Sequence, residues 1–287
     1  MNRFSVILML CSFLVLSAMD YPEPFVEPVN HYEETCSIKG DSLNVRFVGS
    51  CDTPGYAYGV AVAGSYTYVA DDYAGLRIID IFDPSNPAEV GYCNTPGSAR
   101  GVAVLGSYAC VADGDSGLRV IDISDATNPT ELGFCDIPDF AWGVAMSGSY
   151  AYVADGDSGL RVIDISDPSN PTEVGYYDTP GQAYGVALSG IYAYVADGGA
   201  GLRVIDISDP SNPTEVGSCD TPDYTYGVAV AGSYAYVADW NSGLRIIDIS
   251  DPTNPSEAGY YDTPGLAWGV AVKGSYAYVA DLSLIHI

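Results

Sequence analysis

The amino-acid sequence repeats itself with a fixed period of 42 residues through most of its length. The aspartate that closes each Val-Ala-Asp run recurs without insertion or deletion, at Asp71, Asp113, Asp155, Asp197, Asp239 and Asp281. A constant period of this size indicates a repeat architecture, in which each unit buries its apolar surface against its neighbours. The fold of the chain therefore follows from the fold of one repeat.

One repeat contains four short apolar segments separated by turn-forming residues. In the copy around Asp155 they span Gly143–Met146, Tyr150–Ala154, Leu160–Ile165 and Glu173–Tyr177. These segments are rich in Val, Ile and Tyr and are too short for helices, so each is predicted to be a β-strand.

The connections between these segments are typical of an antiparallel sheet. Ser147–Ser149 and Gly156–Gly159 contain the glycines that tight hairpin turns require. Ser166–Thr172 contains two prolines, which lack an N–H donor and disfavour helix. Four antiparallel strands in a 42-residue unit match one blade of a propeller, whereas the repeats of a parallel β-helix are shorter. The sequence predicts an all-β fold, a β-propeller of four-stranded antiparallel blades.

The sequence of the repeat also resembles that of a known family. Leu-Arg-Val-Ile-Asp-Ile-Ser-Asp-Pro-Ser-Asn-Pro is followed by Val-Gly-(Tyr/Cys)-Asp-Thr-Pro-Gly and by Gly-Val-Ala-Val-x-Gly-Ser-Tyr-Ala-Tyr-Val-Ala-Asp. This unit is similar to the LVIVD repeat of bacterial and archaeal exported or surface proteins, and the similarity covers residues 43–281. The resemblance implies a β-propeller and an exported location, and it brings no established catalytic residues.

The N-terminal residues have the features of a secretory signal. Residues 1–18 carry a positive charge at Arg3 near their start, continue through an apolar core at Phe4–Leu16 and end in the small residues Ser17 and Ala18. The apolar core is too short for a transmembrane span. We expect export to the extracellular space, the cell surface or the periplasm, with residues 19–42 as a mature leader before the propeller of residues 43–281.

The two ends of the repeat region are incomplete. Complete units run over Asp52–Tyr261, which gives five blades, and a sixth unit supplies only Gly269–Val272 and Tyr276–Ala280. Leu43–Cys51 has the sequence of an isolated fourth strand, and it is predicted to complete the partial sixth blade so that no sheet edge stays unpaired. Residues 282–287 break the pattern, either as a degenerate third strand or as a non-native tail; the second interpretation is favoured.

The charge of the chain excludes several partners. Its net charge is −27, and its only lysines are Lys39 and Lys273. Such a chain repels phosphate backbones and anionic lipid, so neither nucleic acid nor an anionic membrane is an expected partner. The acidity indicates either solubility outside the cell, the favoured interpretation, or cation binding. A monomeric propeller is expected.

The cysteines occupy few repeat positions. Cys51, Cys93, Cys135 and Cys219 fill one position, which other repeats fill with Tyr177 and Tyr261. Equivalent positions on adjacent blades are expected to exceed the roughly 7 Å Cα separation that a disulfide allows, so these are predicted to be packed thiols. The disulfide state of Cys36 and Cys110 stays open.

No catalytic constellation is evident within the repeats. The only histidines, His31 and His286, lie outside them, which excludes Ser/His, Cys/His and histidine-based metal sites inside the repeat region. Five arginines recur in the third strands and are predicted to bridge carboxylates and carbonyls between blades rather than to bind anions, namely Arg77, Arg119, Arg161, Arg203 and Arg245.

The turns between second and third strands contain a weak calcium pattern. Asp113 and Asp115, and likewise Asp155 and Asp157, alternate with glycine, but the late bidentate acid of a calcium loop is missing. We therefore expect a turn without an ion, and no cofactor.

Positions that vary between repeats are better candidates for binding. The Pro–Gly loop carries Tyr56, Ser98, Phe140, Gln182, Tyr224 and Leu266 at one position, and Tyr58, Arg100, Trp142, Tyr184, Tyr226 and Trp268 two residues later. Tyr73 and Trp240 stand out in the hairpin turns. Propeller topology places these loops and turns on one face, and the candidate ligand residues are Tyr56, Tyr73, Arg100, Phe140, Trp142, Tyr224 and Trp240. The alternative is that the side chains at the Tyr58 position only pack between blades.

These observations favour an exported, non-enzymatic binding or display module whose partner is a protein or a glycan. One alternative is a polysaccharide-active enzyme that uses a carboxylate pair. It would require an acid that breaks the repeat rule and has a raised pKa, and the sequence shows none. A second alternative is a structural spacer within a longer surface protein.

Overall fold

The computed structural model describes residues 48–282, which fold into 22 β-strands. The predicted signal and leader, most of the predicted N-terminal strand, Cys36 and almost all of the anomalous tail lie outside the described residues. Within residues 48–282 there is no helix, and so none that is long and apolar enough to cross a membrane.

The strands form five four-stranded sheets and one two-stranded sheet, with antiparallel neighbours in sequence order. The first sheet contains β1 (Gly59–Ala63), β2 (Tyr66–Ala70), β3 (Leu76–Asp80) and β4 (Ala88–Cys93). The second contains β5 (Gly101–Leu105), β6 (Tyr108–Ala112), β7 (Leu118–Asp122) and β8 (Thr130–Cys135). The third contains β9 (Ala141–Ser147), β10 (Tyr150–Asp155), β11 (Leu160–Asp164) and β12 (Thr172–Tyr177). The fourth contains β13 (Gly185–Ser189), β14 (Tyr192–Ala196), β15 (Leu202–Asp206) and β16 (Thr214–Cys219). The fifth contains β17 (Gly227–Ala231), β18 (Tyr234–Ala238), β19 (Leu244–Asp248) and β20 (Ser256–Tyr261), and the sixth contains β21 (Ala267–Lys273) and β22 (Tyr276–Asp281).

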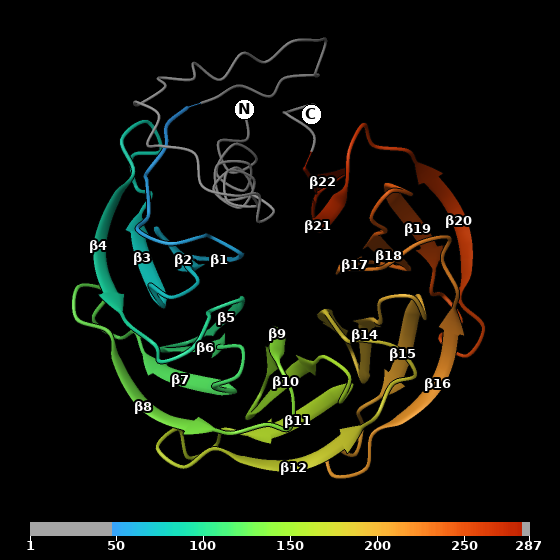
Figure 1. The fold of residues 1–287 in the computed structure, drawn as a ribbon, viewed down its shortest axis with the longest axis horizontal. Coiled ribbons are helices and arrows are strands. Elements are labelled where there is room, and N and C mark those ends of the chain that lie inside the picture. Colours follow the sequence, from blue (N-terminus) through green and yellow to red (C-terminus); the bar gives the residue numbers. More distant parts are fainter. Residues whose placement is uncertain (1–47, 283–287) are drawn as a thin grey trace, which may run out of the picture.

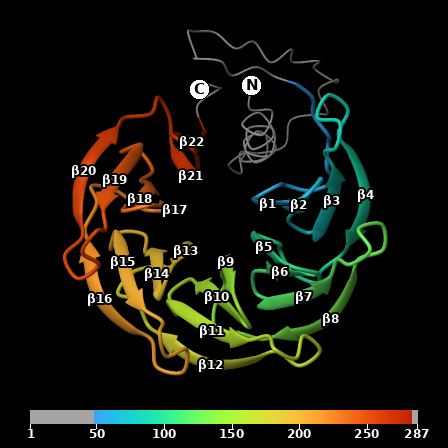
Figure 2. The ribbon, with the colours of Figure 1, turned by 180° about the vertical axis from the view of Figure 1, so that it is seen from behind.

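The sheets are arranged around a central axis like the blades of a propeller (Figure 1). In each complete sheet the first strand lies nearest the axis and the fourth strand forms the outer rim, which the reverse view also shows (Figure 2). This arrangement confirms the predicted all-β propeller of four-stranded blades. The described residues leave the circle open between the first and the sixth sheets.

The strand predictions for the third sheet agree with the structure to within two residues at each end. The third strand, β11, ends at Asp164 and not at Ile165. The Oδ1 atom of Asp164 accepts a hydrogen bond from the N–H of Ser166 at 2.8 Å, and this contact turns the chain out of the sheet.

The apolar core lies between adjacent sheets. Leu160 and Val162 of β11 are fully buried in one cluster with Val195 of β14 and Ile205 of β15. Burial on both faces of a sheet explains why these strands are apolar in consecutive positions and do not alternate.

The innermost strands approach one another at glycines. A Cβ atom on Gly101 of β5 would lie 2.8 Å from the carbonyl oxygen of Trp142 and 3.1 Å from the Cα atom of Gly143. Only glycine permits this approach. The same approach places the residue before Gly101, Arg100, next to the residue before Gly143, Trp142, in the neighbouring sheet.

A second close approach lies at the rim. A Cβ atom on Gly175 of β12 would lie 2.2 Å from the carbonyl oxygen of Pro210 in the next repeat. Gly49 has the same relation to Pro84, at 2.6 Å, so the end of the N-terminal segment occupies the position of a fourth strand that precedes the first sheet. Its predicted pairing with the sixth sheet stays a prediction, because residues 43–47 are outside the described range.

Candidate functional site

A buried aspartate at the end of each second strand anchors the loop that leads into the same sheet. The Oδ1 atom of Asp71 accepts a hydrogen bond from Thr53 Oγ1 at 2.6 Å, and its Oδ2 atom accepts one from the N–H of Gly55 at 2.9 Å. Asp113 and Asp197 make the corresponding contacts with the threonine and glycine of their own repeats. The aspartate therefore fixes the position of the loop that carries the variable aromatic residues.

An arginine on the third strand contacts each of these aspartates. In the third sheet, Arg161 Nε lies 3.4 Å from Asp155 Oδ2, Nη1 lies 3.8 Å from Glu173 and Nη2 lies 3.0 Å from Asp178 Oδ1. Arg77, Arg119, Arg203 and Arg245 contact the equivalent aspartate and glutamate. The guanidinium thus joins the second strand, the fourth strand and, in four of the sheets, the outgoing loop of its own repeat.

Burial raises the pKa of the aspartates at this position. It is the largest effect on Asp71, Asp113, Asp197 and Asp239, and it is opposed by the threonine hydroxyl, by a backbone N–H and by the arginine charge. A buried carboxylate is tolerated when it is paired with a cation and hydrogen-bonded. The repeated group of aspartate, threonine and arginine therefore has a structural role.

The third sheet departs from this rule. Ile137 takes the place of the threonine and Asp139 that of the glycine, so from this loop Asp155 accepts the N–H of Asp139, at 3.2 Å, and no hydroxyl. Burial raises the pKa of Asp155 to about 7, and the charge of Asp139 adds to the rise while Arg161 opposes it. Sequence reasoning missed this deviation, although Ile137 in a threonine position was a visible signal.

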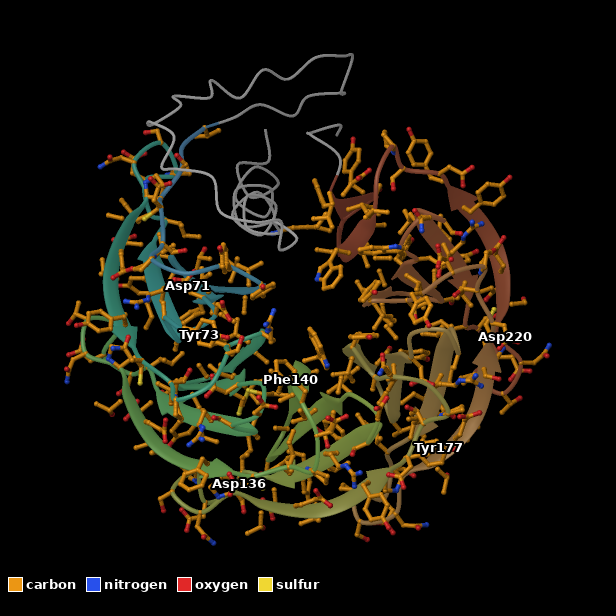
Figure 3. All side chains as sticks on the ribbon, viewed as in Figure 1. Asp71, Tyr73, Asp136, Phe140, Tyr177 and Asp220 are labelled. Carbon is orange, nitrogen blue, oxygen red and sulfur yellow. The ribbon has the colours of Figure 1, made fainter. Side chains whose placement is uncertain are left out.

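The loops and turns that carry the candidate residues lie on one side of the molecule, as predicted. Asp72, in the turn after β2, exchanges two backbone hydrogen bonds with Ala99, which precedes β5. Equivalent bridges join each turn to the loop that enters the next sheet. We call this side the loop face. Figure 3 shows Tyr73 and Phe140 nearer the central opening than Asp136, Tyr177 and Asp220, which lie toward the rim.

Six aromatic side chains form a continuous series of contacts across the loop face. Phe140 contacts Trp142, Trp142 contacts Tyr184, Tyr184 contacts Tyr226, and Tyr226 contacts both Trp240 and Trp268. The centroids of neighbouring rings are 4.1 to 5.1 Å apart, and the two tryptophans at the end meet at 5.6 Å. We call these six residues the aromatic arc. Side chains at the Tyr58 position therefore do pack between sheets, and each keeps part of its surface exposed.

Arg100 continues the series toward the first sheet. Its guanidinium carbon lies 3.9 Å from the centroid of the Tyr58 ring and 5.4 Å from those of Phe140 and Trp142. Arg100 Nη2 is 3.9 Å from Oδ1 of Asp72, and that carboxylate also accepts a hydrogen bond from the Ser98 hydroxyl. Within residues 48–282, Arg100 is the single arginine outside the third strands.

Two residues of the loop face adopt a backbone conformation that favours glycine. Asp72 has φ of 49° and Trp240 has φ of 43°, at the turn position where the second to fourth repeats carry glycine. A residue with a side chain is disfavoured there by about 1–2 kcal/mol. Asp72 contacts Arg100, and Trp240 contacts Trp268, so these two residues lie at opposite ends of the series.

The remaining predicted ligand residues are exposed. Tyr56, Tyr73 and Tyr224 have exposed fractions of 48%, 79% and 49%, and within the described residues none of them joins the aromatic arc. The structure therefore brings together Arg100, Phe140, Trp142 and Trp240, and leaves the three tyrosines as separate exposed rings.

The four weak calcium candidates are not arranged alike. Asp113 and Asp155 are buried and face Arg119 and Arg161, whereas Asp115 and Asp157 are exposed. In the part of the chain that the structure describes, no three His, Cys, Asp or Glu side chains are grouped to hold a metal ion.

A family model described as LVIVD repeat matches six segments of the sequence, at residues 54–95, 96–137, 140–179, 180–221, 223–263 and 264–285. The chain belongs to the LVIVD repeat family. Five of the matched repeats contain one complete sheet each, and the sixth contains β21 and β22. Comparison of this LVIVD repeat protein with curated protein sequences gives no match.

Solved structures show the same fold. The chain is similar to a functionally unknown protein from Desulfotomaculum acetoxidans, with a TM-score of 0.66, 17% identity and coverage of 76% of this chain and 73% of that one. It is also similar to the computationally designed Ika8 protein, with a TM-score of 0.62, 9% identity and coverage of 79% and 69%. A chain of the nidogen/laminin complex gives a TM-score of 0.57, 16% identity and coverage of 75% and 84%. At these identities the likeness concerns the fold alone.

Proposed function

We propose that this LVIVD repeat protein is an exported, non-enzymatic binding module that holds its partner on the aromatic arc of the loop face. The observation that carries the proposal is the positive φ of Trp240, at a turn position that three other repeats fill with glycine. The repeat fold does not need a tryptophan there, and backbone strain retained in a repeated structure, here at Trp240 and at Asp72 beside Arg100, is typical of functional sites.

The chemistry of the arc favours a glycan over a protein partner. Its six members are all aromatic, and their tilted, edge-on and stacked contacts hold each ring in place while part of each ring stays exposed. Rings of this kind suit ligands that combine flat apolar faces with hydroxyl groups. Asp139, Asp157, Asp223 and Asn241, on neighbouring loops and turns, add acceptors and a donor for such hydroxyls.

A carboxylate-dependent enzyme has one observation in its favour, the raised pKa of Asp155 beside Asp139. However, Asp155 is fully buried and lies 3.4 Å from Arg161, so its carboxyl group is not accessible to a polysaccharide. Burial is the largest cause of its raised pKa, which therefore requires no catalytic role.

Isothermal titration calorimetry with xylohexaose, cellohexaose and trigalacturonate tests the proposal. We expect saturable binding of at least one oligosaccharide and its loss in Trp240→Gly, which restores the residue type of the other repeats. Strain relief of about 1–2 kcal/mol offsets lost ring contacts of about 0.5–1.5 kcal/mol each, so this variant is expected to fold normally.

Tyr260→Ser is the matched control, because it removes an aromatic ring at the rim, where the fourth repeat already carries Ser218. It is expected to bind as the parent chain does. Absence of binding to every oligosaccharide, or equal loss in both variants, would overturn the proposal and favour a protein partner or a structural spacer.

A further inference from the structure

The guanidinium of Arg100 has hydrogen-bond donors without acceptors. Among the described residues its only ion pair is the 3.9 Å contact with Asp72, and its buried Nε atom has no hydrogen-bond partner. The Nε atom of Arg161 likewise has no hydrogen-bond partner, but Nε, Nη1 and Nη2 of Arg161 each lie within 3.8 Å of a different carboxylate. A guanidinium carries five N–H donors, and Arg100 has one carboxylate near them where Arg161 has three.

Stacking does not account for these donors. Tyr58, Phe140 and Trp142 lie within 5.4 Å of the guanidinium and act through their ring faces. The N–H groups of a guanidinium lie in its own plane, where they match the two oxygens of a carboxylate. The side chain is 17% exposed, so it is partly accessible from the loop face.

We infer that Arg100 binds a carboxylate of the ligand, and that the ligand is therefore an acidic glycan that contains uronic acid residues. This inference rests on the proposed function. The uronate carboxylate would pair with Arg100, while the apolar face of the same or the next sugar contacts Phe140 and Trp142, the two members of the aromatic arc beside it.

The net charge of −27 does not oppose this pairing at short range. At physiological ionic strength the screening length is about 8 Å, so repulsion from distant acids is largely screened, whereas a contact pair is not. The nearest acid, Asp72, lies at Nη2, and no described carboxylate forms an ion pair with Nη1.

The chain offers a suitable variant. Arg100→Tyr introduces tyrosine, which three other repeats carry at the equivalent position, as Tyr58, Tyr184 and Tyr226. The variant keeps a flat side chain against the neighbouring rings and removes the N–H donors of the guanidinium. Calorimetry at pH 7.5 in 0.15 M NaCl would compare trigalacturonate with its methyl ester, which has the same sugar ring and no charge.

We expect the parent chain to bind the acid at least about tenfold more tightly than the ester, as a charge-assisted bidentate pair implies. Arg100→Tyr should bind both equally and melt at the same temperature as the parent chain.

Equal binding of acid and ester by the parent chain, lost in Trp240→Gly, would overturn this inference and leave the proposed function standing. Preference for the acid that persists in Arg100→Tyr would also overturn it, as would binding only to a peptide with a free C-terminal carboxylate. Absence of binding to both sugars and to the neutral hexaoses would overturn both proposals.

Discussion

Ile137 holds, in the repeat of Asp155, the position from which Thr53 donates its hydroxyl hydrogen bond to Asp71. Ile137 and Asp155 are 18 positions apart in sequence, the same separation as between the threonine and the aspartate of each hydrogen-bonded pair in the other repeats. As a result, the Asp155 carboxylate lacks the hydroxyl donor that opposes burial in the other repeats, and burial raises its pKa to about 7.

The first prediction concerns pH. Because the folded-state pKa of Asp155 is raised from 3.8 to about 7, the folded chain holds this proton more tightly than the unfolded chain does. The contribution of Asp155 to the free energy of unfolding should therefore fall as pH rises from about 4 to about 7 and stay constant above that. Ile137→Thr supplies the missing donor and should raise the free energy of unfolding by about 1 kcal/mol at pH 8, with little gain at pH 4.5. Urea denaturation at both pH values measures this difference.

The fifth repeat provides the control for this prediction. It combines Thr221 with Asp223 at the position of Asp139, and Thr221 Oγ1 donates to Asp239 at 2.7 Å. Thr221→Ile should therefore create the same pH dependence in another sheet. An effect of equal size at pH 4.5 and pH 8 would show that packing, and not the carboxylate, is responsible.

A second prediction concerns the aromatic ring that covers each third-strand arginine. The guanidinium carbon of Arg161 lies 4.7 Å from the Tyr176 centroid, and only the fourth sheet lacks such a ring among the five complete sheets, because Ser218 occupies its position. The Arg203 side chain is accordingly 12% exposed, against 8% for Arg161. Ser218→Tyr should raise the free energy of unfolding by about 0.5–1 kcal/mol, and Tyr176→Ser should lower it by a similar amount, both measured by urea denaturation.

Tyr176→Phe is the matched control, since Phe134 already covers Arg119 at 4.6 Å in the second sheet. This variant should leave the stability unchanged. A loss as large as that of Tyr176→Ser would point to the hydroxyl group instead of the cation–π contact.

Sequence periodicity was sufficient to predict the strands of each repeat and their order in the sheets. Turn glycines and two-faced apolar strands report local geometry that every copy shares, so the third repeat predicts the others. The role of Arg161 was also predictable in outline, because a buried guanidinium must meet carboxylates.

The candidate site was harder to predict, because its properties arise between repeats. The contact between Tyr226 and Trp268 depends on how closely glycines let adjacent inner strands approach. The strained conformation of Trp240 becomes visible only when its φ is compared with that of Gly198. Variation between copies indicated which positions to inspect, but it did not show that Arg100 lies against the Tyr58 ring.

A third prediction concerns Cys110, which is fully buried and takes the position that Tyr152 holds in the third sheet. Burial raises the pKa of its thiol to about 12, so almost none of it is thiolate at pH 8. Iodoacetamide should therefore leave Cys110 unmodified in the folded chain and modify it in 8 M urea, as measured by peptide mass spectrometry. The partly exposed Cys219 serves as the internal comparison and should react earlier. Modification of Cys110 before Cys219 under native conditions would contradict the buried position of β6.

The last prediction compares one glycine position in two repeats. A Cβ atom on Gly175 would lie 2.2 Å from Pro210, whereas one on Gly259 would have no described atom within 4 Å. Gly175→Ala should therefore cost about 1–3 kcal/mol through overpacking. Gly259→Ala should instead be neutral or gain about 0.5 kcal/mol, because alanine restricts the unfolded chain. Neither glycine has a positive φ, so the difference reports only what lies against the sheet, and thermal and urea denaturation of the two variants measure it. Equal losses in both would contradict the open space next to Gly259 at the rim of the fifth sheet.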